Sequence, residues 1–311
     1  MSNQAHKKTS IGGQALIEGI MMRGPETSSM AVRQPDGEIS LSVWPTDKAG
    51  KKPWYKSTPF VRGSFNFIDM MALGYKCLMK SADLAGFEEE EPSKLEKKLM
   101  ELLGDKFSAI FGSAAMLLGV ALSIGLFMVL PTVLVGFIKH FINSQAILTA
   151  IEAVTKITIF VLYLYAVSKL GDVKRVFEYH GAEHKTIACY EAGEELTVEN
   201  VRKYPRFHPR CGTSFMLIVM VVSVLVFSFA SWNSVIGRVL LKLILLPLVV
   251  GISFEIIKLA GRYDNPLTRA ISAPGLWLQN LTTYEPTDDQ IEVAIAAMKP
   301  CIPNDQQQDQ W

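Results

Sequence analysis

Two long stretches without a charged residue constrain the fold of this chain more than any other feature. One runs from Phe107 to Ile138 and the other from Cys211 to Gly237. Each exceeds the ~20 residues that a helix needs to cross the apolar core of a bilayer. Inside that core every backbone polar group must be satisfied within the protein, so apolar runs of this length predict membrane-spanning helices. We therefore expect an integral membrane protein in contact with a lipid bilayer.

Two further apolar stretches, Ala146–Leu170 and Val235–Ala260, are also long enough to span but carry a few charges. Each follows one of the uncharged stretches, which suggests two hairpins. The expected fold class is a membrane α-helical protein with about four transmembrane helices in two hairpins. We also expect a small cytoplasmic α+β N-terminal module and a short helical C-terminal region. Pro131, in the first stretch, predicts a kink or an early helix end there.

The charges in the second and fourth stretches allow two interpretations. They lie near the starts of the stretches, so their long side chains, such as that of Lys156, could extend to the membrane surface. In the sharper interpretation, Glu152 pairs with Arg238 or Lys242 of a neighbouring span. A transporter would need such charges at the midplane of the bilayer, so we rank that class last.

Positive charge in the loops predicts the orientation. The short connections 144–145 and 231–234 lack Lys and Arg, whereas the segment between the hairpins is rich in both. Loops rich in Lys and Arg stay in the cytoplasm. The N-terminus, the central segment and the C-terminus are therefore expected to be cytoplasmic, in a multi-pass arrangement. This orientation requires that Ala146–Leu170 crosses the membrane.

The chain is expected to divide into five regions. These are a cytoplasmic N-terminal module of a hairpin plus helices (1–106), a first transmembrane hairpin (107–170), a cytoplasmic segment (171–210), a second transmembrane hairpin (211–260) and a cytoplasmic C-terminal region with a disordered tail (261–311).

Local patterns predict elements inside the two terminal regions. Ser29–Val43 contains two strand-like runs around the turn Pro35-Asp36-Gly37. Phe60–Leu84 has a helical, apolar pattern, and Ser93–Leu103 predicts an amphipathic helix on the membrane surface or against the protein. Thr287 and Gln290 have capping-box spacing, which predicts a helix from about Asp288 to Met298.

The central segment contains the string HGAEH, in which His180 and His184 are four residues apart. On a helix this spacing places both imidazoles on one face, close enough to share a metal ion. Glu183 lies between them, as in the H-x-x-E-H pattern, where the glutamate is a general base. Gly181 weakens the helix but would let a backbone or a substrate approach closely.

A second pair of candidate ligands, His208 and Cys211, follows in the string HPRCG. Imidazole and thiolate both suit zinc, so His180, His184, His208 and Cys211 could form a closed tetrahedral site. A closed site is structural, whereas a catalytic site leaves one position open. Zinc is the expected divalent metal. Iron or manganese would fit if Cys211 is not a ligand and a carboxylate such as Glu18 is.

Composition excludes several other classes. The formal net charge of +1 over 311 residues lacks the basic excess of nucleic-acid-binding proteins, so no nucleic acid partner is expected. The four cysteines show no disulfide spacing. No apolar run follows the N-terminal lysines, so no cleavable signal peptide is expected.

The string IGGQALIEGIMMRGPE near the N-terminus is rich in glycine but lacks the G-K-[ST] of a phosphate loop. It predicts a strand or turn element with a Glu–Arg pair. In the alternative, Glu18 belongs to the metal site as a further ligand or base.

Four motifs, in this order, resemble those of the YqhQ-like family of uncharacterised bacterial membrane proteins. They are GGQALIEGIMMRGP at Gly12–Pro25, HGAEHKTI at His180–Ile187, HPRCGTSF at His208–Phe215 and PGLWLQNLTTYEP at Pro274–Pro286. The family is generally described only as predicted metal-dependent enzymes. The resemblance implies an inner-membrane protein whose His180, Glu183, His184, His208 and Cys211 form one cluster. It also implies that Glu18 and Arg23 belong to the family signature.

Two hypotheses follow. The first is a metal-dependent membrane hydrolase at the cytoplasmic face, with Glu183 as general base and a lipid, a peptide or a small molecule as substrate. The second is a non-enzymatic membrane scaffold or biogenesis factor. In it a structural metal, if one is bound, clamps the central segment, and the partner is a membrane protein or a nascent protein.

Overall fold

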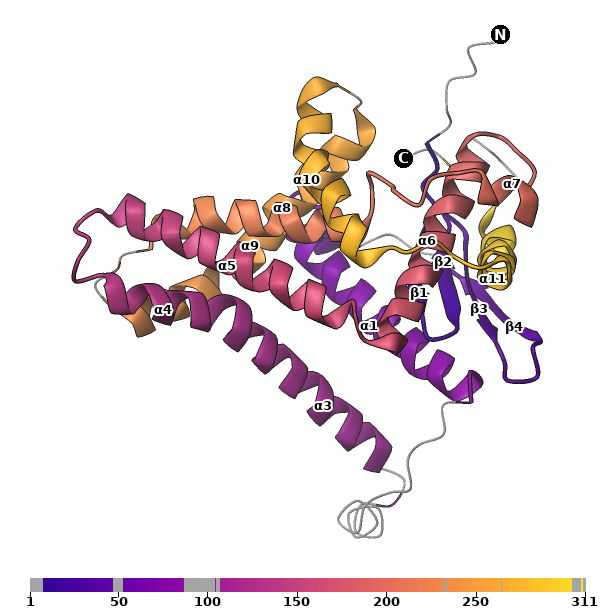
Figure 1. The fold of residues 1–311 in the computed structure, drawn as a ribbon, viewed down its shortest axis with the longest axis horizontal. Helices are drawn as coiled ribbons and strands as arrows, with labels where there is room; N and C mark the ends of the chain where they lie inside the picture. The colour runs from indigo at the N-terminus through magenta and orange to yellow at the C-terminus, as the bar shows by residue number, and fades with distance from the viewer. Residues whose placement is uncertain are drawn as a thin grey trace. The chain divides into compact units, whose positions relative to one another are not determined.

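A computed structural model describes residues 8–46, 53–86, 104, 107–230, 232, 234–263, 265–303 and 309. Most of these residues are helical, and those near the N-terminus form one small antiparallel sheet (Figure 1). The chain divides into two compact units, which we describe separately. The first combines 1–87, 164–222 and 247–311, and the second combines 88–163 and 223–246.

The sheet of the first unit is a meander of four strands in the described part of the chain. Its order along the chain and in space is β1 (Gly12–Leu16), β2 (Gly19–Arg23), β3 (Thr27–Arg33) and β4 (Ile39–Pro45). The hairpin predicted over Ser29–Val43 is confirmed, because these two residues face each other across β3 and β4. Gly37 has φ +89° in the connecting turn, a conformation that glycine adopts without a steric penalty.

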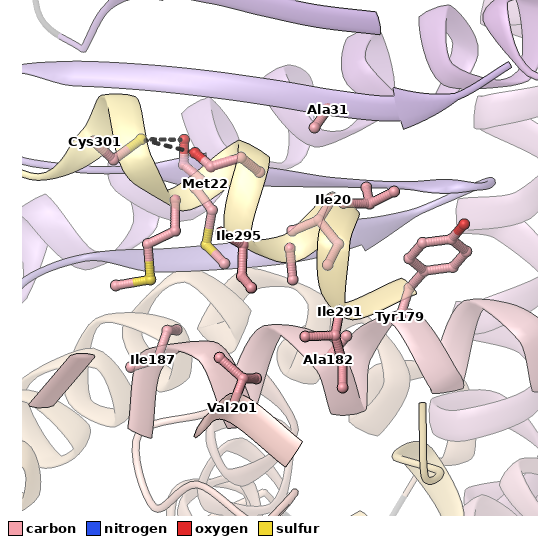
Figure 2. Close-up of a cluster of buried hydrophobic side chains, with 14 of the residues drawn as sticks. Ile20, Met22, Ala31, Tyr179, Ala182, Ile187, Val201, Ile291, Ile295 and Cys301 are labelled. Atoms are coloured by element: carbon pink, nitrogen blue, oxygen red, sulfur yellow. Dashed lines mark hydrogen bonds between the residues drawn. The ribbon is translucent and has the colours of Figure 1, made fainter. Parts of the chain in front are cut away.

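Both faces of the sheet are covered by helices. Alternate side chains of a strand point to opposite faces, so Ile20 and Met22 lie in one cluster of buried side chains and Met21 in another. The first cluster packs against α6 (Gly171–Glu191) and α11 (Asp288–Met298), as Figure 2 shows. Met21 packs on the side of α1 (Val61–Leu84). Full burial of each such side chain contributes about 1.5–3 kcal/mol.

Helix α11 has the bounds that its capping box predicted. The Thr287 side chain accepts from the third residue of the helix, and the Thr287 backbone N–H donates to Gln290 Oε1 over 2.9 Å. Two other helices of this unit are also capped. Thr197 begins α7 (Val198–Arg202), and an Asn265 capping box begins α10 (Pro266–Thr282).

The first unit also contains two short 3-10 turns, η1 (Trp54–Lys56) and η4 (Lys299–Cys301). One residue of the C-terminal tail is also described. That residue, Asp309, is buried and accepts hydrogen bonds from Ser10 N at 3.0 Å and Tyr190 Oη at 2.8 Å. The rest of the tail, for which we predicted disorder, lies outside the described residues. So does the predicted helix Ser93–Leu103.

The second unit contains a long apolar helix with one local irregularity. Helix α3 (Phe107–Ile124) passes through a π turn, η3 (Gly125–Val129), into α4 (Leu130–Ile138). Pro131 is the second residue after the π turn. Proline lacks an N–H and clashes with the carbonyl four residues earlier, which here is that of Phe127. The π turn relieves this clash, so the helix continues past Pro131.

Three helices of the described chain are long and apolar enough to cross a membrane. These segments are Ile110–Ile138, Gln145–Val167 and Val235–Ala260; the last two belong to α5 (Gln145–Val167) and α9 (Val235–Arg262). The expected fourth helix, α8 (Gly212–Phe227), is shorter, with 16 residues. The uncharged run continues to Gly237, but the Ser234 side chain accepts from Gly237 N at 3.1 Å and so caps α9. Absence of charge alone therefore overstated the length of α8.

Within the second unit, the interpretation that the charges of the apolar helices pair with one another is confirmed. Glu152 of α5 accepts a hydrogen bond from Arg238 Nη2 of α9 at 2.8 Å and also pairs with Lys242. All three residues are buried within the protein, so they do not extend to the surface as the alternative interpretation required.

Candidate metal centre

Helix α6 places the two histidines of the HGAEH motif on one face. The ring centroids of His180 and His184 lie 4.4 Å apart. Gly181 between them is explained by a close backbone approach. A Cβ at this position would lie 2.0 Å from the carbonyl oxygen of Tyr284. Tyr284 N–H in turn donates to Phe177 O of α6 at 2.9 Å. The glycine thus lets the segment after α10 run directly along α6.

Backbone carbonyls fix the orientation of both imidazoles. The Nδ1 atom of His180 lies 2.8 Å from Thr282 O, and that of His184 lies 2.6 Å from Arg206 O. A carbonyl oxygen can only accept, so each Nδ1 carries the proton. The Nε2 atoms are then the nitrogens with a lone pair available for a metal, and a hydrogen bond of this kind to the other ring nitrogen is typical of metal-ligating histidines.

Cys211 supplies a third ligand atom at the start of α8. Its Sγ lies 3.1 Å from His180 Nε2, and the ligand atoms of His180, His184 and Cys211 all lie within 4.8 Å of one another. Thr213 donates to the sulfur from its backbone N–H at 3.4 Å and from its hydroxyl at 3.3 Å. Because zinc binds nitrogen at about 2.0–2.1 Å and sulfur at about 2.3 Å, one ion fits among the three atoms.

His208, the fourth predicted ligand, lies beside this trio but is turned toward other partners. Its ring centroid is 5.6 Å from that of His184, and its Nε2 is 3.6 Å from Glu191 Oε2 and 3.4 Å from Arg210 Nη2. Gln279 holds its backbone, accepting from His208 N at 2.8 Å and donating to His208 O at 2.7 Å. The structure therefore groups three of the four predicted ligand atoms.

Glu183 is buried beside the trio, and its Oε2 atom has no hydrogen-bond partner among the described residues. A Cβ on Gly13 of β1 would lie 2.9 Å from the Glu183 carboxyl carbon, so the glycine strand packs directly against this group. An unsatisfied buried polar atom costs about 1–3 kcal/mol, more for a charged group. Such an atom beside three convergent ligands fits a site that receives an ion and its water.

Charge within the cluster favours metal ligation. Burial by itself would raise the pKa of the Cys211 thiol, but the imidazoles of His180 and His184 lower that pKa well below its usual value. Burial lowers the pKa of His180, and the facing Cys211 thiolate more than reverses this, to about 9. Burial raises the pKa of Glu183, opposed by the same two histidines. A thiolate is the form of cysteine that binds metal.

The two signature residues near the N-terminus lie outside the trio. Glu18, at φ +49° between β1 and β2, accepts from Arg175 Nη2 at 2.6 Å and from Tyr179 Oη at 3.1 Å. Arg23 Nη1 lies 2.9 Å from Met70 Sδ. The predicted Glu–Arg pair within the string is therefore wrong, because Glu18 pairs with Arg175 of α6. Glu18 joins the sheet to the helix turn that precedes His180.

Sequence reasoning missed the groups that orient the ligands. Thr282 O, Arg206 O and the Gln279 side chain hold His180, His184 and His208 in place. Backbone carbonyls leave no signal in a sequence. The PGLWLQNLTTYEP motif, which contains Gln279 and Thr282, was the available indication that α10 and the residues after it take part.

Comparisons with known proteins agree on a family. The family described as "Protein of unknown function (DUF1385)" matches residues 58–304. The chain is 37% identical over 287 residues to "Uncharacterized protein YqhQ" of Bacillus subtilis (strain 168). This alignment covers 91% of this chain and 89% of that protein. No solved structure matches significantly.

Proposed function

The chain belongs to the DUF1385 family of proteins of unknown function, and we propose that it is a metal-dependent hydrolase acting at the cytoplasmic face of the membrane. In this proposal His180, His184 and Cys211 hold one divalent ion, zinc by ligand type. Glu183 is the general base.

One observation carries the proposal. Two histidines whose Nδ1–H groups are fixed by carbonyls present their Nε2 atoms toward the same point as a cysteine sulfur. Three protein ligands with one open position are typical of catalytic zinc, whereas structural zinc has four protein ligands. His208, whose Nε2 faces Glu191, leaves the fourth position open.

The role of Glu183 follows from its surroundings. When bound, the ion would act as a Lewis acid on the substrate and lower the pKa of an attacking water. Glu183 accepts the proton of that water at Oε2, the atom without a protein partner. Burial raises its pKa, which brings the carboxyl closer to neutral pH and suits a group that first takes and then returns a proton.

The membrane arrangement is part of the proposal. We infer that α8, extended by the apolar residues that follow it, completes a fourth span, so that both termini lie in the cytoplasm. The Lys- and Arg-rich segment between the hairpins supports this orientation. The substrate would be a lipid, a peptide or a small molecule presented at the surface of the inner membrane.

The second candidate function is a scaffold with a structural metal. It is favoured by the position of the His208 ring, 5.6 Å from that of His184. Rotation of this ring away from Glu191 would add a fourth ligand and close the site. The metal would then clamp α6 to the start of α8, and the partner would be a membrane or nascent protein.

Metal analysis of purified protein in detergent tests both candidates. We expect about one equivalent of zinc in the wild type and in His208→Ala and Glu183→Gln, and loss of zinc in His184→Ala and Cys211→Ser. In the cobalt-substituted protein, added azide should change the absorption spectrum, because an open position binds an external ligand. Zinc lost equally in His208→Ala, with no response to azide, would support the structural site. No metal in any sample would reject both.

A further inference from the structure

The second unit contains a buried group of charges that the proposed function does not use. Glu152 accepts from Arg238 Nη2 at 2.8 Å, and Lys242 and Thr132 also bond to its carboxylate. The relative exposures of Glu152, Arg238 and Lys242 are 6%, 1% and 3%. Since two cations share one carboxylate, this group carries a net positive charge before any other residue is considered.

Lys156 adds a further positive charge. It follows Glu152 by one helical turn and is the central residue of α5, so roughly 16 Å of helix separates it from either end at about 1.5 Å per residue. Its Nζ donates to Ser223 Oγ at 2.6 Å, but Lys156 forms no ion pair with any described residue. The expectation that this charge lies near the start of its stretch is therefore wrong: in a spanning helix an uncompensated ammonium would lie near the middle of the membrane, where charge is costly and commonly marks a functional site.

A cavity of about 20 Å³ lies between these cations. The ammonium groups of Lys156 and Lys242 each lie 5.7 Å from the ring centroid of Phe227, which also lines the cavity. The polar residues that line the cavity are Lys156, Lys242, Ser223, Thr149 and Glu152. About 10–15 Å³ of such space holds one water molecule. The cavity therefore admits a water or a monatomic ion, and it excludes a phosphate or carboxylate headgroup.

We propose that this cavity binds a single halide ion, chloride under physiological conditions. Two cations, Lys156 and Lys242, and one carboxylate line the cavity, and Arg238 already pairs with that carboxylate, so an anion is the ligand that reduces the net charge. The ammonium groups supply N–H donors to it, and the Phe127 and Phe227 side chains form the apolar part of the lining. The site lies wholly within the second unit and is independent of the metal centre in the first.

Direct binding and thermal unfolding of the full chain in detergent test the proposal. Equilibrium dialysis with radioactive chloride should give about one ion per chain in the wild type and none in Lys156→Met. The unfolding temperature of the wild type should rise saturably with sodium chloride or bromide, compared with sodium gluconate at equal ionic strength. Gluconate is too large for the cavity, so it controls for the general effect of salt.

Lys169→Met is the matched control, because Lys169 lies just past the end of α5 and is exposed. It should bind chloride as the wild type does. Lys156→Met should be at least as stable as the wild type in gluconate, since it removes an unpaired cation. Lys156→Gln serves as a second variant if the methionine variant does not give monodisperse protein. Absence of bound chloride in the wild type, or wild-type binding in both Lys156 variants, would overturn the proposal.

Discussion

The Nε2 atom of His180 lies 3.1 Å from the sulfur of Cys211, although the two residues are 31 positions apart in the sequence. The distance is short because the imidazole is held from behind by Thr282 O and the sulfur from the side by Thr213. The facing imidazoles lower the pKa of this thiol well below its usual value. Without a metal the pair has the character of a thiolate and an imidazolium, and in the proposed metal centre both would be ligands.

Thiol labelling should therefore distinguish Cys211 from Cys189 and Cys301. Burial raises the pKa of Cys189 to about 11 and also raises that of Cys301. Alkylation by iodoacetamide near pH 7 requires a thiolate. After removal of metal by a chelator we expect Cys211 to react faster than Cys189 and Cys301, and zinc should suppress this reaction. Mass spectrometry of the digested protein gives the three rates. Equal rates, or no effect of zinc, would contradict the assignment of Cys211 as a ligand.

The close contact at Gly181 gives a prediction of stability. Alanine favours a helix interior by about 1 kcal/mol over glycine. At Gly181, however, the new Cβ would lie 2.0 Å from Tyr284 O. Overpacking of this kind costs about 1–3 kcal/mol, so Gly181→Ala should destabilise the protein. Chemical unfolding in detergent measures the difference. Gly171→Ala, at the start of the same helix with nothing within 4 Å of its Cβ, is the control and should be neutral or slightly stabilising.

Much of the secondary structure could be predicted because it rests on local patterns. The β3–β4 hairpin follows from its turn, and α11 follows from the Thr287–Gln290 capping box. The pairing of His180 with His184 follows from helical spacing. Each of these depends on residues close together in sequence, where period and capping chemistry decide the outcome.

The rest depends on contacts between distant residues. Nothing in the sequence near His208 indicates that its Nε2 faces Glu191, or that Gln279, about seventy residues later, holds its backbone. The length of α8 also could not be judged from charge alone. An uncharged run remains uncharged through the Ser234 cap, so it does not show where one helix ends and the next begins.

The pH dependence of stability tests whether burial raises the pKa of the Cys189 thiol in the folded protein. Its pKa is raised by burial, and by Glu194, from an ordinary value of 9.0 to about 11. A group whose pKa is higher in the folded state contributes its whole stabilisation at pH values below its pKa in the unfolded state. This stabilisation is lost as the pH rises from that value through the pKa of the folded state. Wild-type stability should therefore fall more steeply than that of Cys189→Ala between pH 9 and 11. Unfolding midpoints measured across this range give the two slopes, and parallel slopes would show that Cys189 is not the cause.

The last prediction concerns Gln279, which is buried and bonds to both backbone groups of His208. Alanine at this position leaves a buried N–H and a buried C=O unsatisfied. Each such group costs about 1–3 kcal/mol, so Gln279→Ala should lower the free energy of unfolding substantially. Asn280→Ala is the control, because the Asn280 side chain is exposed and bonds only within α10.

The metal content of the same variant separates two roles of the His208 loop. Arg206 O orients His184 from this loop, and Cys211 ends it, so both belong to the candidate metal centre. If Gln279 only stabilises the fold, Gln279→Ala should keep one equivalent of zinc with unchanged affinity. If it also fixes the ligands, zinc affinity should fall about 10–100-fold, as expected when outer-shell partners of a metal site are removed. We expect the second result, because Gln279 bonds to both backbone groups of His208, in the middle of this loop.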